Sequence, residues 1–181
     1  MKKKPFQSAV IGASGEHLVL SNLLRLNFVA GKAPDNTKDY DLIVLNKDGT
    51  SSSPIQVKTS IRKERGWILQ KKHEKVIKNL FFCFVKMETN SDKTEIYIID
   101  SKTVAHVAET SHKIYLKLPG LKGQKHGDST MRKLYRDYNS IAGLRSKNFK
   151  KHLTKSELKF LNKYSEGWLD KYKDAWHLIG K

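Results

Sequence analysis

Residues 39–60 read DYDLIVLNKDGTSSSPIQVKTS, and this stretch decides the fold class. An apolar run at 42–45 follows two aspartates and leads into 46–49 (NKDG), after which apolar and polar residues alternate from position 55. Asn, Asp and Gly in that spacing are typical of a hairpin turn. We therefore expect two strands, over 39–45 and 55–61, paired antiparallel with each other.

The alternation on these strands places several polar side chains together. Asp41 shares a face with Asp39, while Gln56, Lys58 and Ser60 lie on one face of the second strand, because successive side chains point to opposite sides. Antiparallel pairing then brings Gln56 and Lys58 near Asp41 on one sheet surface. Two plainer interpretations stay open: aspartates that end a loop, and an ordinary half-solvated strand.

The rest of the chain predicts helices and strands around this hairpin. The first element is a helix over 12–26, followed by a strand over 28–32. The run LFFCFV at 80–85 is typical of a central strand buried on both faces. Further expected elements are a helix over 71–79, a strand over 95–100, and helices over 101–108, from a capping box at 154–157, and over 165–179.

The last of these helices places three aromatic side chains on one face, at Trp168, Tyr172 and Trp176. Such spacing predicts core packing, with a base-stacking platform as the alternative. The whole order is helix, three-strand meander, helix, two strands and then helices. It predicts a mixed α/β fold with a mixed sheet flanked by helices and a helical C-terminal extension.

Glu16 is an unusual residue on the first helix. On a helical wheel it falls in the middle of the apolar face formed by Val19, Leu20, Leu23 and Leu24. A buried carboxylate costs several kcal/mol unless it is paired or binds a metal. The alternative is a carboxylate at the edge of the core that accepts hydrogen bonds from backbone amides of the first turn.

Charge is the strongest compositional signal. The 181 residues include 35 Lys and Arg against 18 Asp and Glu, a formal net charge of +17. Over 113–163 alone there are 14 basic residues against three acidic ones. A polyanion is the natural partner, since each phosphate that is neutralised releases counterions. The alternatives are a merely soluble cationic surface and an anionic membrane.

Length and composition predict one domain, with a core over 1–118 and a basic, mainly helical extension over 119–181. The glycine- and lysine-rich stretch 119–128 separates the two parts. The longest apolar run is too short to cross a bilayer. A single cysteine, Cys83, excludes an internal disulfide and any multi-cysteine zinc site. We expect a soluble cytoplasmic protein without a membrane partner.

Taken together, the polar residues form a recognisable pattern. Gly15-Glu16 on the first helix, Tyr40-Asp41 opening a strand, and Gln56-Val57-Lys58 on its partner resemble the motif of the PD-(D/E)xK nuclease superfamily. The resemblance covers about residues 8–100, in the αβββαβ order of that restriction-endonuclease-like core. This layout is also similar to that of Holliday-junction resolvases and restriction enzymes. Gln56 replaces the third acid of the motif, as it does in some restriction and homing nucleases of the superfamily.

The resemblance implies a metal site. Asp41 would be the central Mg²⁺ ligand, Glu16 a direct or water-mediated one, and the side-chain carbonyl of Gln56 and the backbone carbonyl of Val57 would complete the set. Lys58 would position the attacking water or stabilise the pentacovalent phosphate. Because a glutamine brings one negative charge less than an acid, weaker Mg²⁺ binding and a dependence on Mn²⁺ are expected.

The resemblance also implies where DNA phosphates bind. Basic residues just past the motif strand would rim the cleft, and those of the extension would hold phosphates further along a duplex. A solvated basic face is the alternative interpretation for any one of them. These residues are Arg62, Lys63, Arg65, Lys122, Lys125, Arg132, Lys133, Arg136, Arg145, Lys147, Lys150 and Lys151.

The sequence thus predicts a metal-dependent DNA endonuclease of restriction or resolvase type. A homodimer is expected for double-strand cutting, because one site cleaves one strand. The first alternative is a nuclease-fold module that lost catalysis with Gln56 and binds nucleic acid through its charge. The second is a basic interaction protein unrelated to nucleases.

Overall fold

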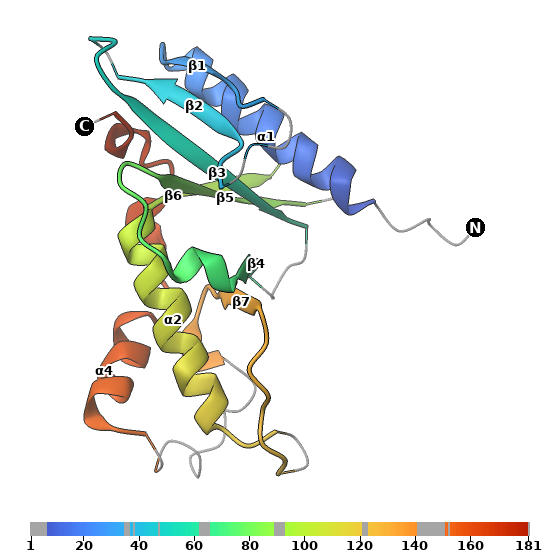
Figure 1. Cartoon of the computed structure of the whole chain (residues 1–181), viewed down its shortest axis with the longest axis vertical. Helices are drawn as coiled ribbons and strands as arrows, with labels where there is room; N and C mark the ends of the chain where they lie inside the picture. Colours follow the sequence, from blue (N-terminus) through green and yellow to red (C-terminus); the bar gives the residue numbers. More distant parts are fainter. Residues whose placement is uncertain are drawn as a thin grey trace. The chain divides into compact units, whose positions relative to one another are not determined.

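A computed structural model describes residues 7–34, 37, 39–46, 48–61, 66–88, 93–120, 123–140, 151 and 153–180 (Figure 1). The chain divides into two compact units that are interleaved in sequence. The first unit comprises Met1–Lys63, Ile77–Ser101 and Tyr172–Lys181, and the second comprises Glu64–Val76 and Lys102–Lys171. The predicted single domain, with its core ending at residue 118, stays a prediction.

The first unit contains a five-stranded mixed sheet in the order β1-β2-β3-β5-β6. β1, β2 and β3 form the antiparallel meander, β3 pairs parallel with β5, and β5 pairs antiparallel with β6. The strands span Val29–Lys32, Leu42–Leu45, Ser52–Ser60, Phe81–Met87 and Thr94–Asp100. The predicted hairpin is confirmed, because β2 and β3 pair antiparallel with Leu42 opposite Ile55.

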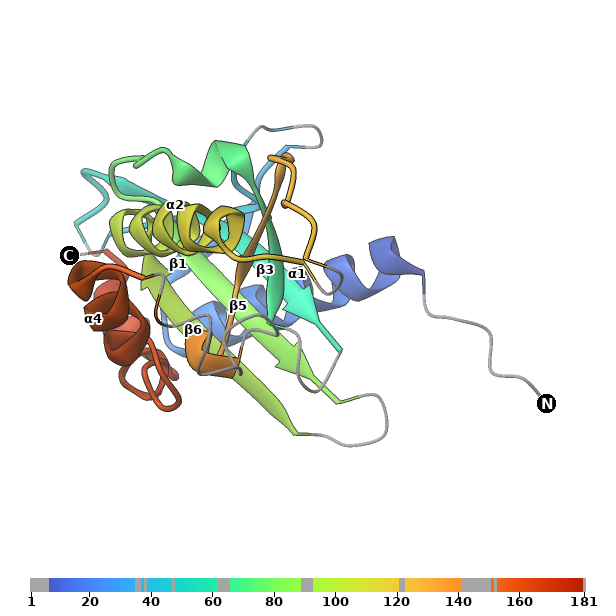
Figure 2. The same ribbon diagram turned by 90° about the horizontal axis from the view of Figure 1, so that it is seen from below.

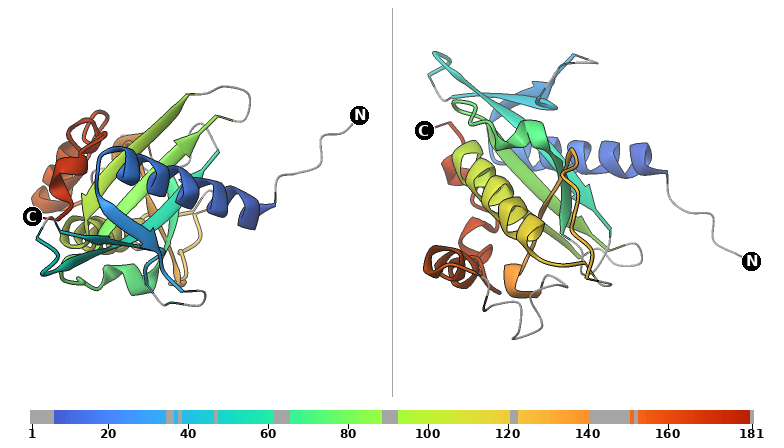
Figure 3. Two further views of the ribbon diagram at one scale, coloured as in Figure 1. Left: turned by 90° about the horizontal axis from the view of Figure 1, so that it is seen from above. Right: turned by 60° about the horizontal axis from the view of Figure 1, so that its bottom comes forward.

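One helix, α1 (Ser8–Arg25), lies across a face of this sheet (Figure 3, left). Its buried positions are Gly15, Val19 and Leu23, which recur every four residues and so form one stripe. These side chains join a core with apolar residues that the strands present on the same face, among them Ile55 and Val57 of β3. The contact between α1 and β3 fixes the position of the residues that follow Gly15.

The central strand is apolar on both faces, as predicted. In β5, Cys83 and Val85 belong to the core beneath α1, whereas Phe82 and Phe84 are buried on the other face with stacked rings 5.8 Å apart. Full burial raises the pKa of the Cys83 thiol, and Cys83 is a packed core residue.

The segment 165–179 is not the single helix that its aromatic spacing predicts. It contains two short 3₁₀ turns, Asp170–Tyr172 and Trp176–Leu178, and its backbone reverses at Gly167 (φ 84°) and Asp174 (φ 50°). A positive φ interrupts helical geometry, so Trp168 and Trp176 do not share a helix face. Ala175 and Ile179 instead pack in the core of the first unit.

The second unit contains a two-stranded antiparallel sheet of β4 (Trp67–Gln70) and β7 (Met131–Leu134). The strand β4 runs directly into the 3₁₀ turn η1 (Lys71–Glu74), which replaces the helix expected over 71–79. Helix α2 (Ser101–Lys117) is twice as long as expected, and α4 (Lys155–Lys163) packs beside it (Figure 2) through the rings of His106 and Phe160.

Two helix starts match their sequence signals. The capping box of α4 is confirmed: the amide of Glu157 donates to Thr154 Oγ1, and the amide of Thr154 donates to Glu157 Oε2 at 2.8 Å. Helix α2 begins at Ser101 as predicted, although the Ser101 hydroxyl accepts from the amide of Ile77.

The predicted fold class is confirmed as mixed α/β, with a five-stranded mixed sheet, the helix α1 across it, and further helices in the second unit. Within the described part of the chain, none of the helices combines the length and apolar character that crossing a bilayer requires.

Candidate active site

The candidate site is built on the pairing of β2 with β3. The amide of Asp41 donates to the carbonyl of Ile55 at 2.7 Å, which fixes Asp41 at the start of β2 beside β3. From there Asp41 Oδ2 accepts from the amide of Val57 at 2.6 Å and from Gln56 Nε2 at 2.5 Å. Three residues of the motif are therefore joined through a single carboxylate oxygen.

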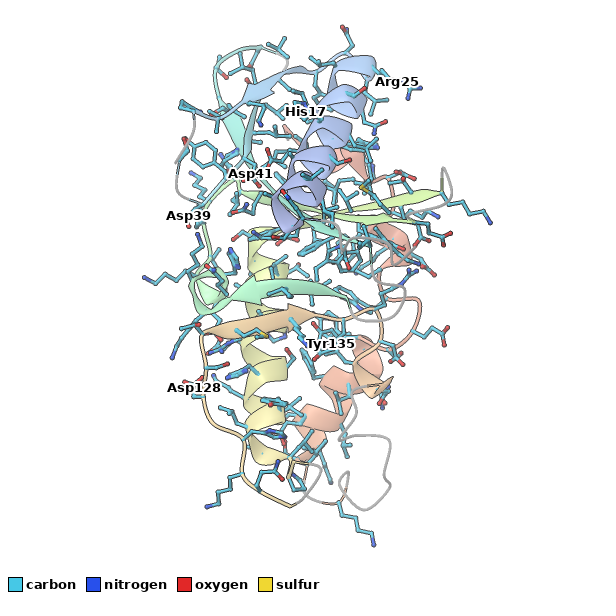
Figure 4. The ribbon with its side chains drawn as sticks, turned by 90° about the vertical axis from the view of Figure 1, so that its right-hand side faces the viewer. His17, Arg25, Asp39, Asp41, Asp128 and Tyr135 are labelled. Atoms are coloured by element: carbon cyan, nitrogen blue, oxygen red, sulfur yellow. The ribbon has the colours of Figure 1, made fainter. Side chains whose placement is uncertain are left out.

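Asp41 also lies next to the first helix, as Figure 4 shows. Helix α1 approaches β3 closely at Gly15, where an added Cβ would lie 1.9 Å from Thr59 Oγ1. Glu16 follows Gly15 directly, so this close packing fixes the position of Glu16 relative to β3.

The helical wheel predicts Glu16 in the middle of the buried face, but the structure does not place it there. The buried stripe runs through Gly15, Val19 and Leu23, and Glu16 is on its flank with 25% of its side chain exposed. The small Gly15 lets the backbone of α1 face the sheet, which rotates Leu24 toward solvent and Glu16 to the edge. There Glu16 Oε2 pairs with Lys32 Nζ at 3.1 Å.

The charges around Asp41 act on each other. Burial raises the pKa of the Asp41 carboxyl, the nearby charge of Glu16 raises it further, and the hydrogen bonds from Val57 and Gln56 and the positive charge of Lys58 oppose this shift. Both Glu16 and Lys58 are therefore within electrostatic reach of Asp41. The two acids and the lysine of the motif occupy one neighbourhood, in which one carboxylate is partly desolvated.

Lys32 is a residue of this neighbourhood that sequence reasoning missed. It ends the edge strand β1, opposite Leu42, and the next amide, that of Ala33, donates to the carbonyl of Asp41 at 2.9 Å. A lysine at the end of a short strand carries no sequence signal of its own. Only the pairing of β1 with β2 brings Lys32 beside Glu16.

The donor set fits a hard divalent cation. Carboxylates of Asp41 and Glu16, the amide of Gln56 and the backbone carbonyl of Val57 are all oxygen donors, the kind that Mg²⁺ and Mn²⁺ prefer. With Nε2 donated to Asp41, the Gln56 amide keeps its carbonyl oxygen for such an ion. Among the described residues, no three or more His, Cys, Asp and Glu side chains gather as a metal-binding group. The site has two carboxylates, with Gln56 in the third position.

The basic residues singled out in the sequence fall into different environments. Lys125 and Lys151 are exposed, while Lys133 and Arg136 are half-buried. Arg132 differs from the expectation of a phosphate-binding surface residue, because it is only 3% exposed and its guanidinium binds Glu74 and the carbonyl oxygens of Ser129 and Met131. Outside the described residues lie Arg62, Lys63, Arg65, Lys122, Arg145, Lys147 and Lys150.

The amino-acid sequence shows no match to known families or curated proteins. Among solved structures, the chain is similar to the bacterial homing endonuclease I-Ssp6803I, with a TM-score of 0.49 and 12% sequence identity over 97% of this chain and 94% of that one. A likeness at this level is one of general outline, so the function must be judged from this chain's own side chains.

Proposed function

We propose that this protein is a metal-dependent DNA endonuclease that hydrolyses phosphodiester bonds with a PD-(D/E)xK-type site in which Gln56 replaces the third acid. The single observation that carries the proposal is the hydrogen bonding of Asp41 Oδ2 to both Gln56 and Val57, with Glu16 and Lys58 in electrostatic reach. These residues come from α1, the start of β2 and β3, and a partly desolvated carboxylate beside charged groups is typical of functional sites.

Asp41, Glu16, the Gln56 carbonyl and the Val57 carbonyl would hold Mg²⁺ or Mn²⁺. When bound, such an ion would neutralise charge that develops on the phosphate and lower the pKa of a water molecule. Partial desolvation strengthens the interactions of the Asp41 carboxylate with any cation, because the local dielectric is lower than in water.

Lys58 has the role of positioning the attacking water and stabilising the added negative charge on phosphorus. A positive charge aimed at the place where charge develops contributes to the rate without reorganisation during the reaction. The alternation of β3 separates Lys58 from Gln56 by one residue, so both project from the same face of the strand.

The strongly basic sequence supports DNA as the substrate. Its net charge of +17 suits a phosphodiester backbone with one charge per phosphate. Cutting both strands at one place needs two such sites, so we include a homodimer in the proposal. Sedimentation in the presence of a duplex would test that part.

A second candidate is a nucleic-acid-binding module without catalysis. One observation favours it: Gln56 Nε2 donates a hydrogen bond to Asp41 Oδ2, and Lys32 forms an ion pair with Glu16. Both carboxylates therefore already have protein partners. In that case the motif would be structural, and binding would depend on charge alone.

Cleavage of supercoiled plasmid with EDTA, Mg²⁺ or Mn²⁺ tests the proposal. We expect metal-dependent nicking or linearisation by the wild type, and a loss of roughly 10²–10⁴-fold in rate in both Lys58→Ala and Asp41→Asn. Lys86→Ala is the matched control, because Lys86 is also a lysine of the same sheet, paired with Glu95 at 3.3 Å.

The binding of plasmid on a gel separates the candidates. Wild-type protein that retards plasmid but never cuts it, in either metal, would favour the binding module. Cleavage that survives in Lys58→Ala would overturn the proposed site even if the protein is a nuclease.

A further inference from the structure

The two-stranded sheet of the second unit has one face that the proposed active site leaves unexplained. In β4 and β7, which we call the ribbon, Ile68 pairs with Lys133 and Gln70 pairs with Met131. Residues directly opposite on antiparallel strands project from the same face, so these four side chains form the outer face of the ribbon. Trp67, Leu69, Arg132 and Leu134 form the inner face, and all four are buried.

The inner face is held firmly. Arg132 binds Glu74, which follows β4 in the chain, and two carbonyl oxygens at the start of β7. The hydroxyl of the fully buried Tyr138 donates to the carbonyl of Lys133 at 3.3 Å and accepts from the amide of Tyr135 at 3.2 Å. The ribbon thus has the rigidity that a recognition element needs. In Figures 1 and 4 the ribbon lies beside α2.

The outer face has an unusual composition for solvent. Ile68 is 61% exposed and Met131 is 51% exposed, and Lys133 and Gln70 occupy the positions directly opposite them. Large apolar side chains gathered on an exposed, short and rigid sheet indicate a contact surface rather than a solvated one. Gln70 also caps η1, where its backbone amide donates to His73 Nδ1 at 2.9 Å, so we give Gln70 a structural role only.

Charge identifies the partner that this face fits. The second unit has 20 Lys and Arg against 8 Asp and Glu, a formal net charge of +12 out of the chain's +17. The turn η1 continues from the end of β4 with exposed Lys71 and Lys72, followed by exposed Lys75. Apolar groups at the centre of a surface with cations at its rim match base edges in a groove between two phosphate backbones.

We infer that the ribbon enters the major groove of duplex DNA and reads base edges through its outer face. The major groove admits a two-stranded antiparallel ribbon, and several DNA-binding proteins place strands there. Lys133 would donate to the O6 and N7 acceptors of guanine, while Ile68 and Met131 would contact thymine methyl groups. Lys71, Lys72 and Lys75 would bind phosphates and fix the register.

This inference rests on the proposed function only in taking duplex DNA as the partner, and not on cleavage. The probe is a library of duplexes with a randomised central segment, selected by the full chain in EDTA so that no duplex is cut. We expect the wild type to enrich a sequence containing guanine and thymine. Lys133→Gln and Ile68→Thr should each change the preference for one base over the others, at separate positions of the duplex, by about tenfold or more.

Two controls separate base reading from general attraction. Lys75→Gln should weaken binding to all sequences alike, without changing the preferred sequence. It should also reduce the slope of log affinity against log salt concentration by about one. Lys159→Gln, at an exposed lysine of α4, should also leave the preferred sequence unchanged. The apolar substitution Ile68→Thr leaves the net charge constant, so any altered preference there cannot come from electrostatics.

Each outcome decides the matter. A wild type that cuts plasmid but enriches no sequence, or ribbon variants that enrich the wild-type sequence, would overturn the inference and leave the nuclease intact. Enrichment that depends on the ribbon, without cleavage in any metal, would support the inference and refute the proposed activity. Ribbon variants that change the sedimentation of the free protein but not its sequence preference would assign the outer face to a second copy of the chain.

Discussion

Gly15 of α1 and Thr59 of β3 are packed so closely that a side chain at position 15 would overlap the Thr59 hydroxyl. The Thr59 oxygen is itself buried and has no hydrogen-bond partner within the described structure. An unpaired buried hydroxyl costs free energy of folding, and glycine in a helix interior costs about 1 kcal/mol relative to alanine. Both costs are accepted at the point that sets the distance of Glu16 from the sheet.

Gly15→Ala should destabilise the protein despite the better helix propensity of alanine. The new Cβ would lie 1.9 Å from Thr59 Oγ1 and 3.0 Å from Thr59 Cβ, so α1 or the Thr59 side chain must shift. We expect a net loss of about 1–3 kcal/mol in the free energy of unfolding, measured in urea. Under the proposed function, the displaced Glu16 should also lower the cleavage rate.

Thr59→Ala supplies the matched test of that cause. Removing the hydroxyl leaves the Cβ contact at 3.0 Å as the shortest one, so Gly15→Ala should cost less in this background. A double-mutant cycle should show a coupling of at least about 0.5 kcal/mol. Strict additivity of the two substitutions would show that the close approach does not limit position 15.

Asp41→Asn should stabilise the fold while it removes the proposed activity. The asparagine Oδ1 can still accept from the Val57 amide and from Gln56 Nε2, but no desolvated charge remains. We expect a rise in Tm on the order of 2 °C near neutral pH. An equal or lower Tm would contradict the view that the ionised carboxylate is held at a cost.

The pH dependence of that difference has a definite sign. The pKa of Asp41 is raised in the folded protein above its ordinary value of 3.8, so the folded state binds the proton more tightly than the unfolded state. The stability of the wild type relative to Asp41→Asn therefore falls as pH rises from about 3.8 through the raised pKa, and is constant above it. Thermal unfolding of both proteins from about pH 4 to about pH 7 measures this window.

Gln56→Glu should make the stability depend on metal. The side chain is only 6% exposed, and the substitution replaces a hydrogen-bond donor to Asp41 with a third carboxylate of the site. In EDTA we expect a loss of about 1–3 kcal/mol in the free energy of unfolding. Mn²⁺ should restore more of the Tm of this variant than it adds to the wild type. If added Mn²⁺ leaves the Tm of the variant unchanged, the residues do not form a cation site.

Lys32→Ala should affect metal use more than stability. Lys32 and Glu16 form an ion pair whose side chains are 42% and 25% exposed, and such pairs contribute under about 1 kcal/mol. Without the competing amine, Glu16 is available to a cation, so half-maximal cleavage should need less Mg²⁺. Lys86→Ala, which breaks a comparable pair with Glu95, is the control and should leave the metal requirement unchanged.

The parts of the fold that could be predicted are those with local signals. Alternation and a four-residue turn in 39–60 indicate the β2–β3 hairpin, and pairing follows from the turn itself. The burial of LFFCFV follows from its composition, and the start of α4 from its capping box. In each case the residues that decide the structure are neighbours in sequence.

The parts that were missed depend on residues far apart in the chain. β4 and β7 have four residues each and pair Trp67 with Leu134, a separation no local pattern reveals. The alternation of β7 is hidden because its buried polar position is Arg132, whose partner Glu74 comes from another segment. The false helix over 165–179 reflects aromatic spacing that positive φ angles at Gly167 and Asp174 override.

The candidate site divides in the same way. Asp41, Gln56 and Lys58 meet because they lie on adjacent strands of one hairpin, which the sequence predicts well. The true setting of Glu16 depends on how α1 rotates over Gly15, and the part of Lys32 depends on an edge strand whose own pattern is weak. Their roles in catalysis stay predictions.

The interleaving of the two units has a consequence for the order of synthesis. Ala175 and Ile179 complete the core beneath α1, and the amide of Asp174 donates to the carbonyl of Ile96 at 2.9 Å. Residues 102–171 are nevertheless translated after the sheet and before this closing segment. At usual rates of elongation those residues occupy the ribosome for roughly 4–14 s. Throughout that interval the nascent sheet keeps part of its apolar face uncovered, as a target for chaperones, while the segment that closes it is still to be made.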